Sequence, residues 1–192
     1  RVIEAADDTL GTVSLRPHLV WGPGDPHFLP RLVERARAGK LKLVGDGSAR
    51  VDSTYIDNAV DAHRFAAERL SPGAPISGRA YFISNGEPLP IATLIVKLPG
   101  TAALPPPDRF VPERTAYVAA TVLETIHRTL RIAKEPLVTR FVVRQLATDH
   151  WFDLSAARDE LGYRAAVTID EGIERLRASL AAHPASPGRD SR

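Results

Sequence analysis

One short apolar segment constrains the fold more than any other part of the sequence. Residues 12–21, TVSLRPHLVW, follow Gly11 and run directly into Gly22-Pro23-Gly24. A short apolar run between turn residues is typical of a strand buried in a parallel sheet. Glycines after such a strand permit positive φ and close approach of a ligand, and open α/β sheets bind ligands at the carboxyl ends of their strands. Residues 15–26, LRPHLVWGPGDP, therefore predict a binding loop after a strand, and an ordinary Pro/Gly turn is the alternative.

Helical and extended patterns alternate along the remaining chain. Apolar residues at helical spacing predict helices at 28–38, at about 59–70 with Asp57 or Asn58 as its cap, and at 115–134. The tight GDG turn at 45–47 joins two short extended segments, while 79–84 predicts another strand. The terminal segment 1–8 is interpreted as the tail of a helix, and two short helices are expected after Ser155 and after the Thr168–Glu171 capping box.

Composition excludes several classes of function. Lys and Arg number 25 against 23 Asp and Glu, so no basic footprint for nucleic acid is present. The chain has no cysteine, which excludes disulfides and thiolate metal sites and favours a reducing, cytoplasmic compartment. Its 6 histidines include no H-x-H or H-x-x-x-H pair, so no metal site is expected.

Five segments carry a resemblance to a known family. They are LRPHLVWGPGDP, FLPRLVERARAGK, GDGSARVDSTYIDNAVDAH, GRAYFISNGEP and WFDLSAARDELGY. In this order they resemble the carboxyl half of an extended short-chain dehydrogenase/reductase. Within that superfamily they are similar to the 3β-hydroxysteroid dehydrogenase family, in particular its bacterial 2-alkyl-3-oxoalkanoate reductase-like branch. The resemblance implies an α/β fold, the C-terminal part of a Rossmann-type enzyme, with a few remaining sheet strands and a mixed α/β substrate-binding lobe.

The resemblance also implies a domain division. Residues 1–24 would end the nucleotide-binding Rossmann domain, and 25–182 would form mainly the substrate-binding lobe, with 51–85 partly returning to the Rossmann sheet. Residues 183–192 are polar and are expected to form a disordered tail.

Site roles follow from the same resemblance. The backbone after the proline of the first strand would face the nicotinamide of NAD or NADP, which assigns Pro17, His18, Leu19 and Val20 to cofactor binding. The following loop would line the substrate cleft, which makes Trp21, Asp25, His27 and Phe28 candidates for substrate binding. Arg50 is a further substrate-binding candidate, because nucleotide-sugar relatives use an arginine near this place on a diphosphate.

Two parts of the family's chemistry have no match in this sequence. No glycine-rich dinucleotide fingerprint occurs, and no Tyr-x-x-x-Lys pair exists. The residues four positions before Lys40, Lys42, Lys97 and Lys134 are Ala36, Ala38, Thr93 and Leu130. No catalytic residue is therefore assigned, and residues 1–8 are interpreted as the far end of the helix that carries the catalytic pair. We expect the chain to be part of a longer enzyme and to be inactive alone.

The resulting hypothesis is the substrate-binding half of an NAD(P)-dependent oxidoreductase. Its substrate would carry a hydroxyl or keto group on an apolar molecule, either a sterol or a long-chain 3-oxo or 3-hydroxy acid. A nucleotide-sugar epimerase or dehydratase is one alternative. A non-catalytic module that binds a membrane or a partner is the other.

The helix around 117–132 has a broad apolar face. Arg128, Arg131 and Lys134 would meet headgroups at a membrane surface, and the residues that would dip into it are Tyr117, Leu123, Ile126 and Leu130. Packing into the core and a homodimer face are the alternatives for the same residues.

Overall fold

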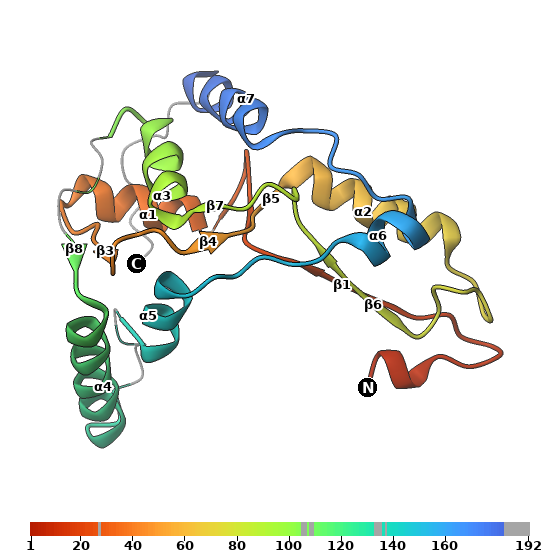
Figure 1. Cartoon of the computed structure of the whole chain (residues 1–192), viewed down its shortest axis with the longest axis horizontal. Helices are drawn as coiled ribbons and strands as arrows, with labels where there is room; N and C mark the ends of the chain where they lie inside the picture. The colour runs from red at the N-terminus through yellow and green to blue at the C-terminus, as the bar shows by residue number, and fades with distance from the viewer. Residues whose placement is uncertain (27, 105–106, 108–109, 133–135, 137, 183–192) are drawn as a thin grey trace. The chain divides into compact units, whose positions relative to one another are not determined.

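The structure is a computed structural model that describes residues 1–26, 28–104, 107, 110–132, 136 and 138–182. The segment 183–192, predicted to be a disordered tail, lies outside these residues. Short strands and helices alternate along the chain (Figure 1). The strands are β1 (Val13–Pro17), β2 (Val20–Trp21), β3 (Leu43–Val44), β4 (Arg50–Val51), β5 (Thr54–Tyr55), β6 (Arg79–Ile83), β7 (Leu89–Pro90) and β8 (Phe110–Val111). The helices are the 3₁₀ turn η1 (Ile3–Ala5) and α1 (Phe28–Arg37), α2 (Ile56–Arg69), α3 (Ile91–Gly100), α4 (Glu113–Thr129), α5 (Arg140–Ala147), α6 (Ser155–Leu161) and α7 (Ile169–Ala182).

Contacts divide the chain into two compact units. Unit 1 comprises Arg1–Pro30, Asp52–Glu87 and Phe152–Arg192, and unit 2 comprises Arg31–Val51 and Pro88–Trp151. Unit 1 therefore combines three separate stretches of sequence. The assignment of residues 1–24 and of part of 51–85 to a nucleotide-binding domain stays a prediction.

Parallel strands form the centre of unit 1. β1 pairs with β6 in parallel from Val13 opposite Arg79 to Pro17 opposite Ile83, as the apolar run predicts, and β2 pairs in parallel with β5. Side chains alternate along β6, so that Tyr81 and Ile83 are buried while Phe82 on the other face is 40% exposed. One face of this strand pair is therefore covered and the other is open.

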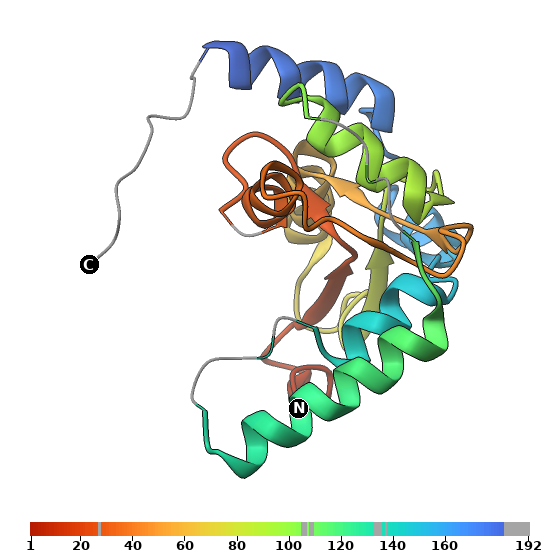
Figure 2. The same ribbon diagram turned by 90° about the vertical axis from the view of Figure 1, so that its left-hand side faces the viewer.

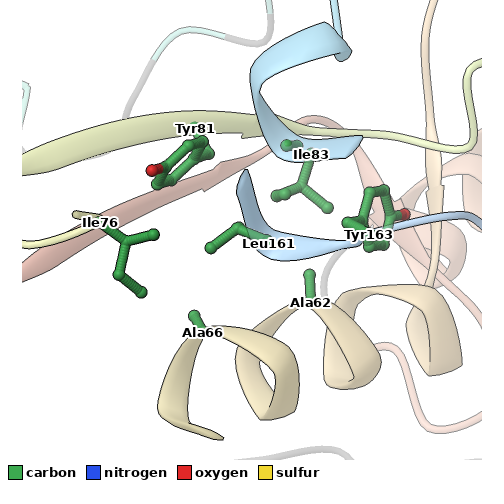
Figure 3. Close-up of a cluster of buried hydrophobic side chains, with 8 residues drawn as sticks. Ala62, Ala66, Ile76, Tyr81, Ile83, Leu161 and Tyr163 are labelled. Atoms are coloured by element: carbon green, nitrogen blue, oxygen red, sulfur yellow. The ribbon is translucent and has the colours of Figure 1, made fainter. Parts of the chain in front are cut away.

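The covered face of β1 and β6 contributes to a hydrophobic core. Figure 3 shows Tyr81 and Ile83 of β6 with Leu161 of α6 and with Ala62 and Ala66 of α2. Small alanines on α2 let the helix lie close to these larger side chains.

A tyrosine at the edge of this core is tied to an acidic partner. The hydroxyl of Tyr81 donates to Glu160, and Arg79 pairs with the same carboxylate at 3.0 Å. Burial, followed by this hydrogen bond, raises the pKa of Tyr81 to about 12. The phenol is therefore neutral at physiological pH and serves as a structural donor.

Two buried asparagines connect the end of β6 to the segment before α7. Asn58 donates to Asn85 Oδ1 at 2.8 Å and to the Val167 carbonyl at 2.7 Å, and its own Oδ1 accepts the Val167 N–H at 3.0 Å. Asn85 donates to the same carbonyl at 2.9 Å and accepts the Tyr55 N–H at 2.9 Å. The prediction that Asn58 caps a helix starting near Ala59 is wrong, because α2 begins three residues earlier and buries this side chain.

Unit 2 contains the remaining strands. β3 pairs in parallel with β8, and β4 pairs antiparallel with β7. The two predicted extended segments form as β3 and β4, joined by a turn with positive φ at Gly45 and Gly47, and they pair with β8 and β7 rather than with each other. The carbonyls of Gly47 and Ala49 accept the first N–H groups of α3, from Ala92 at 3.1 Å and Ile91 at 2.8 Å, so the loop caps a helix instead of closing a strand pair.

Helices α4 and α5 complete unit 2, and Figure 2 shows α4 lengthwise with α5 beside it. Ala116 and Ala120 of α4 pack with Val143 of α5 and Val44 of β3. The helix predicted at 115–134 is confirmed in part, because α4 spans Glu113–Thr129 and ends before Arg131, whose φ is 50°. Over the described residues, no helix is long and apolar enough to cross a membrane.

The predictions for the ends of the chain are confirmed in part. The predicted helix tail at residues 1–8 contains only the short turn η1. Gly162 ends α6 in the left-handed conformation, and Thr168 Oγ1 accepts the Glu171 N–H at 3.2 Å, as expected for the first half of a capping box.

Candidate functional site

The candidate cofactor site lies where β1 ends and β2 begins, within unit 1. Pro17 is exposed at the end of β1, and His18, Leu19 and Val20 are half-buried. The His18 N–H donates to the Ile83 carbonyl at 3.0 Å, so the pairing with β6 extends one residue beyond the strand. The segment therefore lies at the carboxyl edge of two parallel strands, where α/β proteins bind ligands.

Leu19 separates the two strands with a left-handed backbone. Its φ is 47°, a conformation that residues other than glycine adopt rarely and at a cost of about 1–3 kcal/mol. The carbonyl of Leu19 accepts the Thr54 N–H at 3.2 Å, whereas its own N–H has no acceptor in the described part of the chain. The Leu19 N–H, which has no acceptor there, is able to donate a hydrogen bond to a carbonyl oxygen of a ligand at this edge.

Thr54 fixes this break in the strand from behind. It is fully buried, and its hydroxyl donates to the His18 carbonyl at 2.7 Å and lies 3.1 Å from the Ile83 carbonyl. Through its hydroxyl and its N–H, Thr54 holds the carbonyls of two successive peptides, those of His18 and Leu19. Sequence reasoning missed this residue, although the polar run Asp-Ser-Thr in an otherwise apolar strand segment was a signal.

A cluster of three rings borders the strand end. Phe82 and Phe152 are stacked with centroids 4.2 Å apart, and the His18 ring meets Phe152 edge-on at 5.1 Å. We call His18, Phe82 and Phe152 the ring cluster. Because Phe82 is 40% exposed, the ring cluster offers an apolar surface beside the unclaimed Leu19 N–H.

A buried carboxylate holds the ring cluster in place. Asp52 is 1% exposed, and its Oδ2 accepts the Phe152 N–H at 2.9 Å. Its Oδ1 has no hydrogen-bond partner among the described residues. Sequence reasoning did not single out Asp52 either.

Trp21 lies in the interior of unit 1 rather than on a surface. It is 1% exposed, its Nε1 donates to Ser53 Oγ at 3.0 Å, and its ring meets Tyr55 edge-on. Burial is the largest cause of a raised pKa for Tyr55. Substrate contact by Trp21 stays a prediction, and the described arrangement gives the indole a packing role.

The remaining loop residues lie at the start of α1. Asp25 accepts the N–H groups of Phe28 at 3.0 Å and of Leu29 at 2.7 Å, so its carboxylate caps the helix. Phe28 is the half-buried first residue of α1. His27 lies outside the described residues. Their roles toward a substrate stay predictions.

Arg50 belongs to β4 in unit 2. Its N–H donates to Asp149 Oδ1 at 2.8 Å and its Nη2 donates to the Pro88 carbonyl at 3.2 Å. These contacts attach β4 to the segments around β7 and Asp149. A role for Arg50 in phosphate or substrate binding stays a prediction.

The described residues of this candidate site offer groups of the kind that bind a ligand. It combines a backbone donor, an aromatic surface and buried polar groups that position both. In the described part of the chain, no group of His, Asp and Glu gathers in a way that could hold a metal ion. An unclaimed donor beside an apolar surface suits the amide-bearing ring of a nicotinamide.

Comparison with solved structures defines the class of fold. The UDP-glucuronic acid 4-epimerase of Bacillus cereus in complex with NAD superposes with a TM-score of 0.57 at 22% identity, over 88% of this chain and 44% of that chain. The fold is thus that of the Rossmann-type epimerase and dehydratase enzymes, which confirms the predicted α/β class.

The sequence then gives the family. The 3-beta hydroxysteroid dehydrogenase/isomerase family model matches residues 1–108, and the chain belongs to this family, as its motifs predict. The 2-alkyl-3-oxoalkanoate reductase of Stenotrophomonas maltophilia is 51% identical over 182 residues, which are 95% of this chain and 55% of the reductase. The mouse sterol-4-alpha-carboxylate 3-dehydrogenase, decarboxylating, is 35% identical over 85% of this chain and 46% of its own length. The chain spans about half the length of the curated relatives that it matches.

Proposed function

We propose that the chain is the substrate-side half of an NAD- or NADP-dependent oxidoreductase that acts on a hydroxyl or keto group of an apolar molecule. The observation that carries this proposal is the 51% identity over 182 residues to a protein named as a 2-alkyl-3-oxoalkanoate reductase. Among the apolar substrates considered, a long-chain 3-oxo acid is therefore favoured over a sterol, whose named relative is 35% identical.

The strand break supports a role in cofactor binding. When bound, the nicotinamide ring exchanges a hydride with the carbon that carries the hydroxyl or keto oxygen. In this proposal the Leu19 N–H donates to the carboxamide oxygen, and Thr54 holds the peptide that presents it. Pro17, His18 and Val20 form the adjoining wall.

The ring cluster supports an apolar ligand. Phe82 and Phe152 stack at the carboxyl end of β6, and Asp52 anchors Phe152 through its N–H. An aromatic surface of this kind binds apolar or planar groups and excludes water from a reacting centre.

The chain supplies binding and no proton transfer. It has no Tyr-x-x-x-Lys pair, so the general acid and base of the reaction would belong to the remaining half of the enzyme. We therefore propose that the chain alone shows no turnover.

A chimera tests the proposal. The chimera joins this chain to the part of the Stenotrophomonas reductase that the chain does not match. Oxidation of NADH is then compared with oxidation of NADPH. A 2-alkyl-3-oxo acid, a 3-oxosterol and a UDP-sugar are offered as substrates. We expect reduction of the 2-alkyl-3-oxo acid by the chimera and none by the chain alone.

Each other outcome has a definite meaning. A chimera that folds and binds dinucleotide but epimerises only the UDP-sugar would replace the proposal with the nucleotide-sugar alternative. A folded chimera that transforms none of the three would favour the non-catalytic module. Turnover by the chain alone would refute the statement that its chemistry lies elsewhere.

A further inference from the structure

The chain contains two asparagines, and both lie in the buried connection between the end of β6 and the segment before α7. They differ in the residue that follows: Asn58 precedes Ala59, whereas Asn85 precedes Gly86. An asparagine followed by glycine is chemically labile in a flexible chain, because glycine has no Cβ to shield its backbone nitrogen from the asparagine side chain. A labile pair of residues therefore lies inside a structural contact.

The reaction of such a pair needs no enzyme, metal or second substrate besides water. The Gly86 nitrogen loses its proton and attacks Cγ of Asn85, and the bond from Cγ to Nδ2 breaks as Nδ2 takes up a proton and leaves as ammonia. The product is a five-membered succinimide ring. Water then opens the ring at either carbonyl, which gives aspartate or isoaspartate at position 85. The net change is the hydrolysis of one amide to a carboxylic acid with release of ammonia.

The folded chain restrains the side chain that would be attacked. Asn85 is 7% exposed. Its Oδ1 accepts the Tyr55 N–H at 2.9 Å and the Asn58 amide at 2.8 Å, and its Nδ2 donates to the Val167 carbonyl at 2.9 Å. Tyr55 and Asn58 belong to β5 and α2, whereas Val167 lies in the irregular segment between α6 and α7. Release of Val167 is therefore the local opening that most readily lets Asn85 turn toward Gly86.

The fold itself requires both members of the labile pair. Gly86 has a φ of 70°, the left-handed conformation that glycine adopts without strain, and its N–H donates to Ser84 Oγ at 3.1 Å. Position 85 requires a side chain that donates and accepts at once, because it serves a carbonyl on one side and two N–H donors on the other. An amide meets this requirement and a carboxylate does not.

The product of the reaction is unable to restore the connection. Hydrolysis replaces the Nδ2 donor of Asn85 with an oxygen, which would face the Val167 carbonyl where the amide now donates at 2.9 Å. Two acceptors at this distance repel, and a buried carboxylate without a cation is unfavourable. Isoaspartate in addition inserts a methylene group into the main chain just before Gly86. Either product therefore keeps the segment before α7 detached.

From these contacts we propose that Asn85 is a site of spontaneous modification, at which deamidation during local opening permanently releases the segment before α7. The hydrogen bonds of Asn85 delay the reaction, and the reaction removes those bonds. An opening that lasts long enough is therefore not reversed by refolding, and the site limits the lifetime of folded unit 1. This inference does not depend on the proposed enzymatic function.

Peptide mass spectrometry tests the proposal on the 192-residue chain itself. The chain is incubated at mildly alkaline pH, folded or unfolded in urea, and trypsin then places the two asparagines in separate peptides, 51–64 and 80–97. In urea we expect Asn85 to react faster than Asn58, the internal control, by about tenfold or more. In the folded chain Asn85 should react more slowly than in urea, again by about tenfold or more.

Two further measurements separate local opening from global unfolding. At urea concentrations below the unfolding transition, the rate at Asn85 in wild type should rise with a shallower slope than global unfolding has. Asn58→Ala removes one bond to Asn85 and the bonds to Val167, and should raise the rate by about tenfold or more. The matched control is Leu15→Ala, which weakens the core of the same unit outside the amide network. For an equal loss of stability, this control should accelerate the reaction less.

The substitution Asn85→Asp imitates one product of the reaction. Its urea midpoint should be lower than that of wild type, and hydrogen exchange over 163–182 should be faster. The modified fraction of aged wild type carries one additional negative charge, so anion exchange separates it from the unmodified fraction. This fraction should show the same lower midpoint as Asn85→Asp.

Several results would overturn the proposal. A folded wild type that reacts at Asn85 as fast as the chain in urea would show that the hydrogen bonds give no protection. A urea dependence as steep as that of global unfolding would remove the role of Val167, and this series on wild type decides the point if Asn58→Ala does not fold. An Asn85→Asp variant as stable as wild type would show that the modification releases nothing.

Discussion

Replacement of Asn58 by alanine tests whether the buried amides hold unit 1 together. Asn58 is fully buried and links α2 to the segment before α7 through bonds to Ala166, Val167 and Asn85. The substitution removes every one of these bonds while leaving the helix itself intact, because alanine is the best helix former.

The expected loss of stability depends on which former partners of Asn58 keep another hydrogen bond. The Val167 carbonyl retains the Asn85 amide, and Asn85 Oδ1 retains the Tyr55 N–H. The Ala166 N–H belongs to an exposed residue and is able to bond water. The Val167 N–H remains buried without an acceptor, at about 2 kcal/mol, and the small cavity adds about 1 kcal/mol. The free energy of unfolding should fall by about 3 kcal/mol.

Urea denaturation followed by tryptophan fluorescence measures this cost. The chain has 2 tryptophans, and Trp151→Phe leaves the buried Trp21 as a probe that belongs to unit 1. In that background the midpoint and slope of the Asn58→Ala transition are compared with those of the parent. The control is Val60→Ala on the exposed side of the same helix, which should change stability by less than about 0.5 kcal/mol. A loss of less than about 1 kcal/mol in Asn58→Ala, with an unchanged slope, would contradict the reasoning.

Three further predictions concern single contacts. Gly172→Ala should destabilise unit 1 by about 1–3 kcal/mol, because the added Cβ would lie 2.7 Å from Cδ2 of Tyr55. Thermal unfolding measures this effect, and an unchanged midpoint would refute the prediction. Tyr81 has a pKa raised above its ordinary value of 10.0 to about 12, so its contribution to stability is complete below about pH 10 and is lost as the pH rises through about 12. Urea titrations across this range should show a steeper decline for wild type than for Tyr81→Phe, and equal slopes would count against the Glu160 contact. In the chimera, Thr54→Val should raise the KM for the dinucleotide more than it lowers kcat, whereas Thr54→Ser should restore binding; equal behaviour of the two variants would show that the hydroxyl does not position the strand break.

Local patterns in the sequence predicted much of the fold. The apolar run before Pro17 gave a parallel strand, the 3.6-residue periodicity gave α1 and α4, and Gly162 ended α6 as expected. These features depend on residues that are neighbours along the chain. The family could be predicted for the same reason, because its motifs are short and contiguous.

The missed features depend on contacts between distant residues. The sequence around Asn58 predicted a helix cap. Its burial depends instead on a hydrogen bond to Val167, which lies 109 positions later in the chain. The GDG turn and its two extended segments were predicted, but their pairing with β8 and β7 depends on residues far along the chain. Leu19 gave no sign of its left-handed backbone, since leucine is rare there and the carbonyls around it are held by Thr54 from another strand. At the candidate site, sequence could therefore identify the segment but not the residues behind it.

Unit 1 is built from three stretches that are separated along the sequence, and this has a consequence for biosynthesis. A ribosome releases β1, α2 and β6 well before Phe152–Ala182, so Asn58 and Asn85 lack the Val167 carbonyl as an acceptor while the stretch Pro88–Trp151 of unit 2 emerges. Until α6 and α7 follow, the nascent chain exposes the apolar side of Tyr81 and Ile83 to whatever is near. Chaperones should therefore engage this stretch late in translation, and a premature stop codon before α6 should yield a product that is degraded rather than one that is merely shorter.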